Sequence, residues 1–378
     1  WRTPRAADPG RSVQQFLSAL SQGDRFLRPK SASRQTWVEL QAREVRPGRA
    51  ESDFIIIAYC PSVNGLERIE LAPETPLPST SVWIDLVSPT REEQKTAEKL
   101  MGAEIPTRDE IASIETSDRL YAEPGALVMT VQMPMATRTL DPILSSVTFV
   151  LSSKRLVTVR YGEPKSIALL SKKVQGDATI AHLGPAVLFA LLEIIVDRCA
   201  DEMENASARY DELAVQVFGD GLNTRKTASY QVAIKQLGQI GLHVAKMHDV
   251  CTSLSRALLF LNTNARRVGM GDEQAAEVKT YGRDVRSIKE HADAMDNKLA
   301  FLLDATVGLV TLEQNQISKI FTVLGLVFLP PTLIASIYGM NFTNMPELKW
   351  EQGFLFSLGM MFVSVVLTFL FFRWKRLL

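Results

Sequence analysis

The stretch IFTVLGLVFLPPTLIASIYGMNF, Ile320–Phe342, contains no charged side chain. Its part from 320 to 338 has nineteen residues, enough to cross a hydrocarbon core of about 30 Å at about 1.5 Å per helical residue. A second uncharged stretch, GFLFSLGMMFVSVVLTFLFF, covers residues 353–372. Two such runs so close together favour two transmembrane helices over buried helices of a soluble protein. Pro330 and Pro331 interrupt the first run, which membrane helices tolerate.

Basic residues flank the two spans on the side away from their connecting loop. Lys319 precedes the first span, and Arg373, Lys375 and Arg376 surround the end of the second. The loop between the spans holds two glutamates and one lysine. The excess of positive charge predicts that both termini are cytoplasmic. We therefore expect a multi-pass membrane protein with residues 342–352 outside.

Composition limits the classes of partner. The 378 residues include 42 Lys and Arg and 42 Asp and Glu, so no overall positive field points to nucleic acid. The first fifty residues hold ten Lys and Arg against four Asp and Glu. We interpret residues 1–52 as a basic, loosely ordered leader, with contact to anionic lipid headgroups as the alternative. Three widely spaced cysteines argue against a disulfide framework and for buried thiols.

The chain between the leader and the first span changes character twice. Residues 53–183 hold short β-rich runs typical of strands and a helix start at Thr90, which predicts an α/β domain. The strands are expected at 54–59, 82–86, 126–133, 147–151 and 156–160. Residues 184–271 predict a helical hairpin broken near Gly219-Asp220-Gly221, and residues 272–319 a stalk helix that enters the membrane. The spans follow at 320–341 and 353–373, and a basic tail at 374–378.

Gly339-Met340-Asn341 stands at the outer end of the first span, and Met345-Pro346-Glu347-Leu348 follows in the loop. This arrangement resembles the CorA family of magnesium and divalent-cation transporters. The resemblance extends more loosely to Tyr281-Gly282-Arg283-Asp284-Val285 and to Trp83-Ile84-Asp85. It implies an α/β cytoplasmic domain followed by long helices and two transmembrane helices, assembled as a funnel-shaped homopentamer. It implies no enzyme activity and no small organic substrate.

The resemblance also implies which ion is transported and which residues form the selectivity filter, Gly339-Met340-Asn341. The family's expected function is channel-like passage of hydrated Mg²⁺ down its electrochemical gradient, with Co²⁺ and Ni²⁺ as further ions. A Zn²⁺ transporter of the same superfamily is the alternative, although Met340 favours the magnesium branch. Because Mg²⁺ gives up its water reluctantly, a conducting site should offer it neutral oxygens. The Asn341 amide supplies one such oxygen. The Gly339 carbonyl supplies another, because a residue without a Cβ lets the backbone turn its carbonyl towards the axis. Asn341 as a helix C-cap is the competing interpretation.

One side of the first span, read inward from Asn341, presents a stripe of residues at helical spacing. The stripe comprises Thr332, Leu329, Gly325, Ser318 and Asn315. By resemblance, Thr332 and Asn315 offer polar contacts in a pore, and Leu329 belongs to an apolar constriction that blocks conduction by dewetting. Helix packing explains small and polar residues at such positions equally well. Glu347 adds a ring of negative charge at the outer mouth, or is a solvated loop residue.

Asp284 lies in the segment that resembles the family's regulatory region. In the family, intracellular Mg²⁺ bridges acidic groups of neighbouring subunits in this region and holds the pore closed. Asp304 is a second candidate ligand in this chain. A ligand that binds only the closed arrangement shifts the population towards it. An ordinary charged helix surface is the alternative for both residues.

Two rival classes have less support. A membrane-anchored enzyme would need a recognisable site, yet Gly-x-Ser-x-Gly, a P-loop and paired-cysteine zinc spacing are absent from the sequence. His243, His248 and Cys251 are the nearest approach to a metal cluster, and the two histidines, five residues apart, do not share a helix face. A membrane-tethered helical scaffold would leave the Gly-Met-Asn motif without a role.

Overall fold

The structure, a computed structural model, describes residues 55–72, 75–112, 115, 119–135, 143–180, 183–219, 226–340 and 352–374. The chain divides into two compact units. The first unit comprises Trp1–Phe218 and Lys235–Leu302, and the second comprises Gly219–Ile234 and Leu303–Leu378. The basic leader lies outside the described residues, as does the tail after Trp374.

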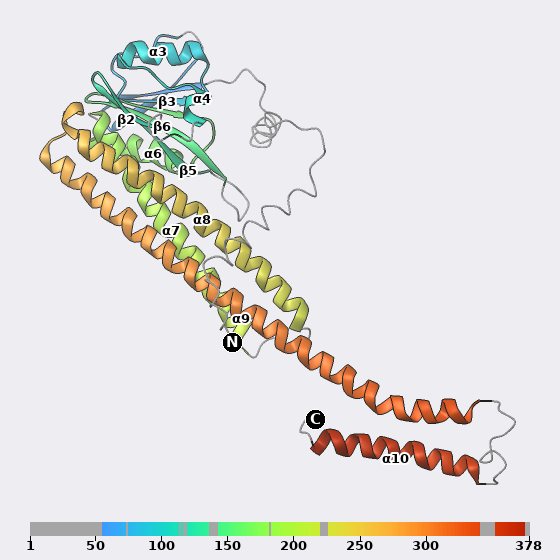
Figure 1. Ribbon diagram of the computed structural model, residues 1–378. Coiled ribbons are helices and arrows are strands. Elements are labelled where there is room, and N and C mark those ends of the chain that lie inside the picture. The colour runs from blue at the N-terminus through green and yellow to red at the C-terminus, as the bar shows by residue number, and fades with distance from the viewer. Residues whose placement is uncertain are drawn as a thin grey trace. The chain divides into compact units, whose positions relative to one another are not determined.

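A seven-stranded sheet forms the centre of the first unit (Figure 1). Its order is β2-β1-β3-β7-β6-β5-β4, and only β3 and β7 are parallel neighbours. The strands are β1 (Ile55–Ser62), β2 (Gly65–Leu71), β3 (Trp83–Val87), β4 (Leu120–Glu123), β5 (Ala126–Pro134), β6 (Leu144–Ser152) and β7 (Leu156–Arg160). The five strands expected from β-rich runs are all present. The two that the sequence did not reveal, β2 and β4, are the edges of the sheet, where strands are short or carry charges.

Helices cover both faces of the sheet. Helices α3 (Arg91–Met101) and α4 (Arg108–Ala112) lie on one face, and α6 (Lys165–Gly176) and α7 (Gly184–Phe218) on the other (Figure 1). Thr90 caps α3 as predicted, because its hydroxyl accepts from the backbone N–H of Glu93 and the Glu93 carboxylate accepts from the backbone N–H of Thr90 at 2.7 Å. The apolar core under α3 and α4 consists of Ile56, Ile84, Leu86, Ala97, Ala103, Ile105, Ile111, Ala126, Val128, Val150, Val157 and Val159.

A buried polar network joins the two parallel strands. Asp85 of β3 is 1% exposed, and its carboxylate lies 2.9 Å from Nη2 of Arg160 at the end of β7. The Thr158 hydroxyl donates to Asp85 Oδ1 at 2.7 Å, and the indole N–H of Trp83 donates to Thr158 Oγ1 at 3.1 Å. Each charged group therefore has partners inside the protein, which a buried ion pair requires.

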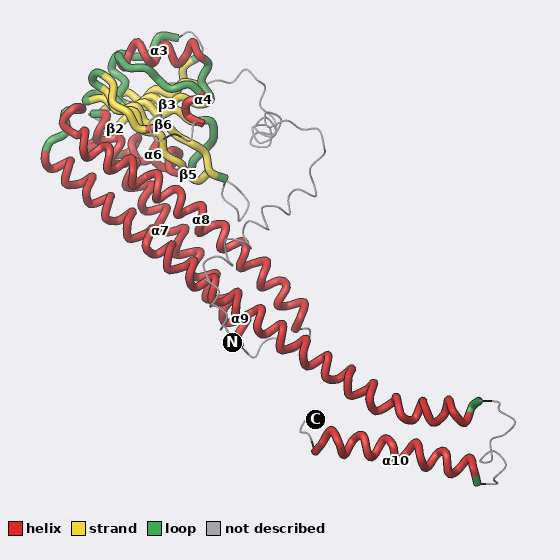
Figure 2. Tube along the Cα trace, viewed as in Figure 1, coloured by secondary structure: helices red, strands yellow, loops and turns green. Residues whose placement is uncertain are grey.

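Three long helices run side by side in the first unit (Figures 1 and 2). They are α7, α8 (Lys226–Asn264) from Lys235 onward and α9 (Asp272–Tyr338) as far as Leu302. The thiols of Cys199 on α7 and Cys251 on α8 are both buried. The short helices η2 (Ala178–Ile180) and η3 (Ala265–Val268) precede α7 and α9. All three cysteines are free and buried, as expected.

Helix α9 has 67 residues and runs unbroken from the first unit into the second. It passes through Pro330 and Pro331 without ending, so one helix leads into the first apolar stretch. It ends at Tyr338, and α10 (Gly353–Trp374) contains the second stretch. Both helices are long and apolar enough to cross a membrane.

Candidate ion pathway

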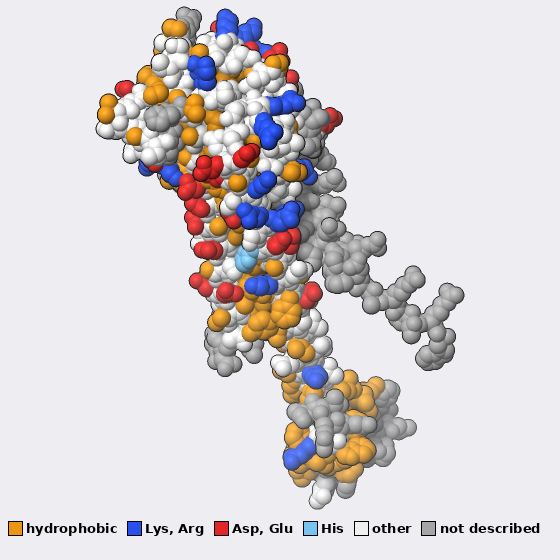
Figure 3. All heavy atoms as spheres, turned by 90° about the vertical axis from the view of Figure 1, so that its left-hand side faces the viewer, with side chains coloured by type: hydrophobic (Ala, Val, Ile, Leu, Met, Phe, Trp, Pro, Cys, Tyr) orange, Lys and Arg blue, Asp and Glu red, His pale blue; other side chains and the backbone are white. Residues whose placement is uncertain are grey.

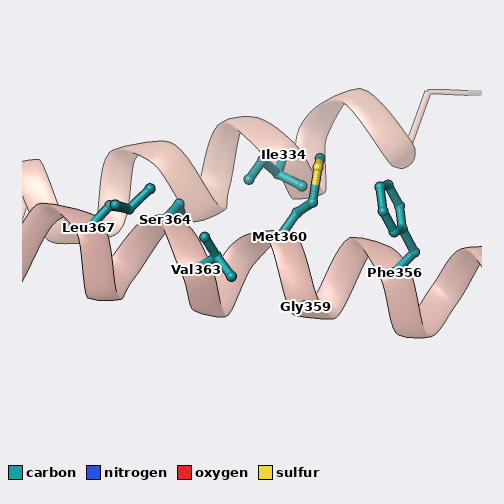
Figure 4. A pocket seen from close by; sticks show the side chains of 7 residues that line it. All are labelled: Ile334, Phe356, Gly359, Met360, Val363, Ser364 and Leu367. Atoms are coloured by element: carbon teal, nitrogen blue, oxygen red, sulfur yellow. The ribbon is translucent and has the colours of Figure 1, made fainter.

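One side of α9 packs against α10 within the second unit. Between residues 320 and 340 the partly buried positions are Val323, Val327, Pro330, Pro331, Ile334 and Tyr338, and every other position is exposed. Figure 4 shows Ile334 facing the side chains of Phe356 and Met360 on α10. These residues line an open apolar groove of about 420 Å³ together with Gly359, Val363, Ser364 and Leu367. The spacing of three or four residues defines one face of the helix.

The predicted stripe occupies the opposite side of α9. Asn315, Ser318, Gly325, Leu329 and Thr332 are all exposed, Leu329 to 63%. At 3.6 residues per turn their directions fall in the half of the helix that faces away from Val327 and Ile334. The structure therefore brings the five residues onto one face that α10 leaves uncovered. An uncovered face of a span meets lipid, another copy of the chain or an aqueous lumen.

Two residues that the sequence analysis omitted belong to the same face. Phe321, 69% exposed, lies between Ser318 and Gly325, and Ser336 follows Thr332 by four residues. Strict use of the helical period would have found both, because each fills a gap in the spacing. The completed face is polar at Asn315 and Ser318, apolar at Phe321, Gly325 and Leu329, and polar again at Thr332 and Ser336.

The predicted filter begins where α9 ends. The N–H of Gly339 donates to Ala335 O at 2.9 Å, and that of Met340 donates to Ile337 O at 3.3 Å. A Cβ added to Gly339 would lie 3.0 Å from the Ala335 carbonyl oxygen, so a larger residue would crowd this last turn. Asn341 and Glu347 lie outside the described residues.

Both candidate regulatory residues lie on α9 and are exposed. Asp284 and Asp304 are twenty residues apart along that helix, which is more than five turns, so one ion cannot reach both within a chain. Tyr281, three residues before Asp284, donates to Glu277 Oε1 at 2.9 Å. Burial raises the pKa of Tyr281, as do Glu277, Glu193 and Asp197.

The histidines do not form a metal centre with Cys251. His243 lies 3.5 Å from Glu202 of α7, whereas His248 lies 3.5 Å from Asp293 of α9. The two side chains therefore face different helices, as their five-residue separation predicts. Among the described residues there is no group of three His, Cys, Asp or Glu side chains that could hold a metal ion.

An α/β domain, long helices and two apolar spans define a membrane protein with two transmembrane helices and a large domain outside the bilayer. The chain belongs to the family of CorA-like Mg²⁺ transporter proteins, whose model matches residues 78–376. It is 32% identical over 313 residues to the magnesium transport protein CorA of Escherichia coli K12, covering 83% of this chain and 96% of that protein.

Other comparisons agree with this assignment. The magnesium transport protein CorA of Yersinia pseudotuberculosis is also 32% identical over 313 residues, with coverage of 83% and 96%. The complete structure of the CorA magnesium transporter from Methanocaldococcus jannaschii superposes with a TM-score of 0.66 at 20% identity, covering 84% of this chain and 97% of that one. The structural likeness shows that the fold is shared.

Proposed function

We propose that copies of this chain surround an aqueous pore that conducts hydrated Mg²⁺ across the membrane down its electrochemical gradient. The observation that carries the proposal is the face of α9 opposite α10, which is uncovered and changes from polar to apolar to polar along its length. One chain contributes one such face and cannot enclose a lumen, so the function requires a ring of copies. We infer the funnel-shaped homopentamer that the CorA resemblance implies.

The filter in this proposal is Gly339-Met340-Asn341 at the outer end of α9. Carbonyl and amide oxygens arranged in a ring can hold an ion that keeps its water, which suits Mg²⁺ better than a tight carboxylate cage. Glu347 adds negative charge that raises the cation concentration at the outer mouth. Co²⁺ and Ni²⁺ share the size and charge of Mg²⁺ and are the further candidate ions, with Zn²⁺ as the alternative cargo.

The apolar section of the face supplies the barrier of the closed pore. Phe321 and Leu329 are exposed to 69% and 63% in the single chain. A ring of such side chains excludes water from a narrow lumen and blocks ions without a mechanical plug. Gly325, between them, has no atom from elsewhere in the described residues within 4 Å of an added Cβ.

With both termini in the cytoplasm, each segment of the chain is assigned to one side of the membrane. Residues 53–183, 184–271 and 272–319 form the cytoplasmic α/β domain, helical hairpin and stalk; 342–352 is the external loop; and both termini are cytoplasmic at a bacterial inner membrane. Membrane lipids surround the spans, and the leader, 1–52, is a candidate for contact with their headgroups. The role is transport and not catalysis.

Flux measurement in liposomes tests the proposal. The purified chain, reconstituted in vesicles that contain a Mg²⁺-sensitive dye, is expected to admit Mg²⁺ along an inward gradient. Asn341→Ala should lower the initial rate about tenfold, the effect of losing one hydrogen bond to a charged partner. Asn344→Ala removes an amide from the same loop outside the motif and serves as the matched control. Vesicles without Mg²⁺ uptake, or equal rates for both variants, would leave a helical scaffold as the better assignment.

Regulation gives a second prediction. Asp284→Ala is expected to raise Mg²⁺ flux severalfold when the compartment facing the α/β domain holds millimolar Mg²⁺, because the closed arrangement loses a ligand that stabilises it. Asp272→Ala, another exposed aspartate on α9, is the control. Flux is measured across a series of Mg²⁺ concentrations on that side. If Mg²⁺ inhibits Asp284→Ala and the parent chain at the same concentrations, Asp284 has no regulatory role.

A further inference from the structure

A groove runs along one flank of α10 beside α9. It has a volume of about 420 Å³ and is lined by Ile334 of α9 and by six residues of α10 between Phe356 and Leu367 (Figure 4). Phe356 is 46% exposed and Leu367 is 61% exposed, although both line the groove. A Cβ added to Gly359 would meet no neighbouring atom of the described residues within 4 Å. The side chains of this chain therefore leave room for a ligand here.

The groove lies beside the contact between the spans and not within it. The buried or partly buried positions of α10 include Ser357, Met361, Val365 and Thr368. At about 100° per residue, these positions point on average more than 90° away from the lining residues of α10. Because α10 supplies six of the seven lining residues and packs on the side of α9 opposite the uncovered face, the groove faces away from the proposed lumen. A surface of this kind meets the bilayer.

The chemistry of the groove is that of hydrocarbon. Its one polar side chain is Ser364, whose hydroxyl already donates to Met361 O at 2.7 Å. The surface of the two spans, at the lower end of Figure 3, is mostly hydrophobic. A partner that brought free polar backbone groups would leave them without hydrogen bonds in the membrane. An alkyl chain has no such groups, so the lining suits it best.

The dimensions fit one alkyl chain. Phe356 and Leu367 are eleven residues apart, about 16 Å along the helix, and one leaflet is about 15 Å of a hydrocarbon core of about 30 Å. Dividing the volume by this length gives a mean cross-section of roughly 26 Å². A helix about 10 Å wide needs roughly 80 Å². A single alkyl chain, with its carbons about 4.0–4.5 Å from their neighbours, needs roughly 20 Å². A helix of a second copy is therefore too wide for the groove.

We propose that this groove binds one acyl chain of a phospholipid from the outer leaflet. The inference goes beyond Mg²⁺ conduction and uses the proposed function only for the orientation of α10, whose first residue, Gly353, is then at the outer surface. Phe356 follows Gly353 by three residues, whereas Leu367 precedes the end of α10 by seven. The groove thus starts near the outer surface and reaches the middle of the bilayer. A chain held there fills the space beside the α9–α10 contact and stabilises the pair of spans.

Lipid binding to the full-length protein tests the site directly. The protein is purified in detergent, freed of native lipid and titrated with palmitoyl-oleoyl phosphatidylcholine, and native mass spectrometry counts the lipids bound per chain. We expect one tightly bound lipid per parent chain and a rise in Tm, because a ligand of the folded state stabilises it. Gly359→Phe fills the groove and should weaken lipid binding about tenfold or more and remove the rise in Tm. The matched control is Leu358→Phe, because Leu358 is 53% exposed on the opposite flank of α10.

A smaller substitution keeps the test decisive if Gly359→Phe fails to fold. Gly359→Ala adds one methyl group where no neighbour lies within 4 Å, and should weaken lipid binding about fourfold, the equivalent of one methylene group. Equal lipid affinity in the parent chain, Gly359→Ala and Leu358→Phe overturns the site. Loss of the oligomer in Gly359→Phe with an unchanged count of bound lipid also overturns it, because a second copy then covers the groove. Mg²⁺ flux is a separate measurement: a parent chain that binds the lipid but passes no Mg²⁺ overturns the proposed function and leaves the lipid site standing.

Discussion

Asp85→Ala is expected to lower the free energy of unfolding of the α/β domain by about 3–5 kcal/mol, the usual cost of removing one partner of a buried ion pair. The substitution leaves the Arg160 guanidinium, whose side chain is 11% exposed, without its carboxylate. It also leaves the Thr158 hydroxyl without the acceptor it uses at 2.7 Å. A loss of this size is a large share of the stability of an ordinary domain. The measurement is the urea midpoint of the full-length protein in detergent, followed by tryptophan fluorescence.

Two comparisons make the Asp85 prediction specific. Glu70→Ala removes a partner of the exposed Arg68–Glu70 pair on the edge strand β2, and should cost about 0–1 kcal/mol. Replacing both buried partners, Asp85→Leu with Arg160→Met, should recover most of the loss because no charge is then left unpaired. An Asp85→Ala midpoint within the range of Glu70→Ala, or a double variant less stable than Asp85→Ala, would contradict this account of the network.

Two edge strands and the Asp85–Arg160 pair are features of the fold that could not be predicted from the sequence. Apolar, β-branched runs marked the five inner strands, because strands covered on both faces require them. Strand β2 mixes apolar residues with the exposed Glu67, Arg68 and Glu70 at one edge of the sheet. Strand β4, at the other edge, has four residues. Neither sequence differs clearly from that of a loop. Asp85 was noticed in the sequence as part of a family resemblance. Its pairing with Arg160 could not be inferred, because 75 residues separate the two and only the sheet order brings them together.

The candidate pathway, too, could be predicted from the sequence only in part. Helical spacing alone placed Thr332, Leu329, Gly325 and Ser318 on one side of α9, since periodicity is a property of the sequence. Which side α10 covers depends on how the two spans pack, and that required the structure.

Leu329→Asn is expected to raise Mg²⁺ flux through the closed pore by roughly a hundredfold, because a ring of amides lets water enter the apolar section and about 2.7 kcal/mol removed from a barrier is a factor of a hundred. The assay uses liposomes with high Mg²⁺ on the side of the α/β domain, where the parent chain should be closed. Leu329 is suited to the test because it is 63% exposed on the uncovered face, so the change need not disturb the packing of α9 against α10.

The control must carry the same substitution on the same helix. Leu324→Asn meets this condition: Leu324 is 47% exposed and, five residues earlier, points about 140° away from Leu329. An asparagine there meets lipid or packed protein and should leave the closed pore closed. If both variants leak equally, the polar residue has perturbed the bilayer and no apolar gate is involved. If neither leaks, Leu329 does not border the lumen, and the constriction must be sought at Phe321, two turns further along the same face.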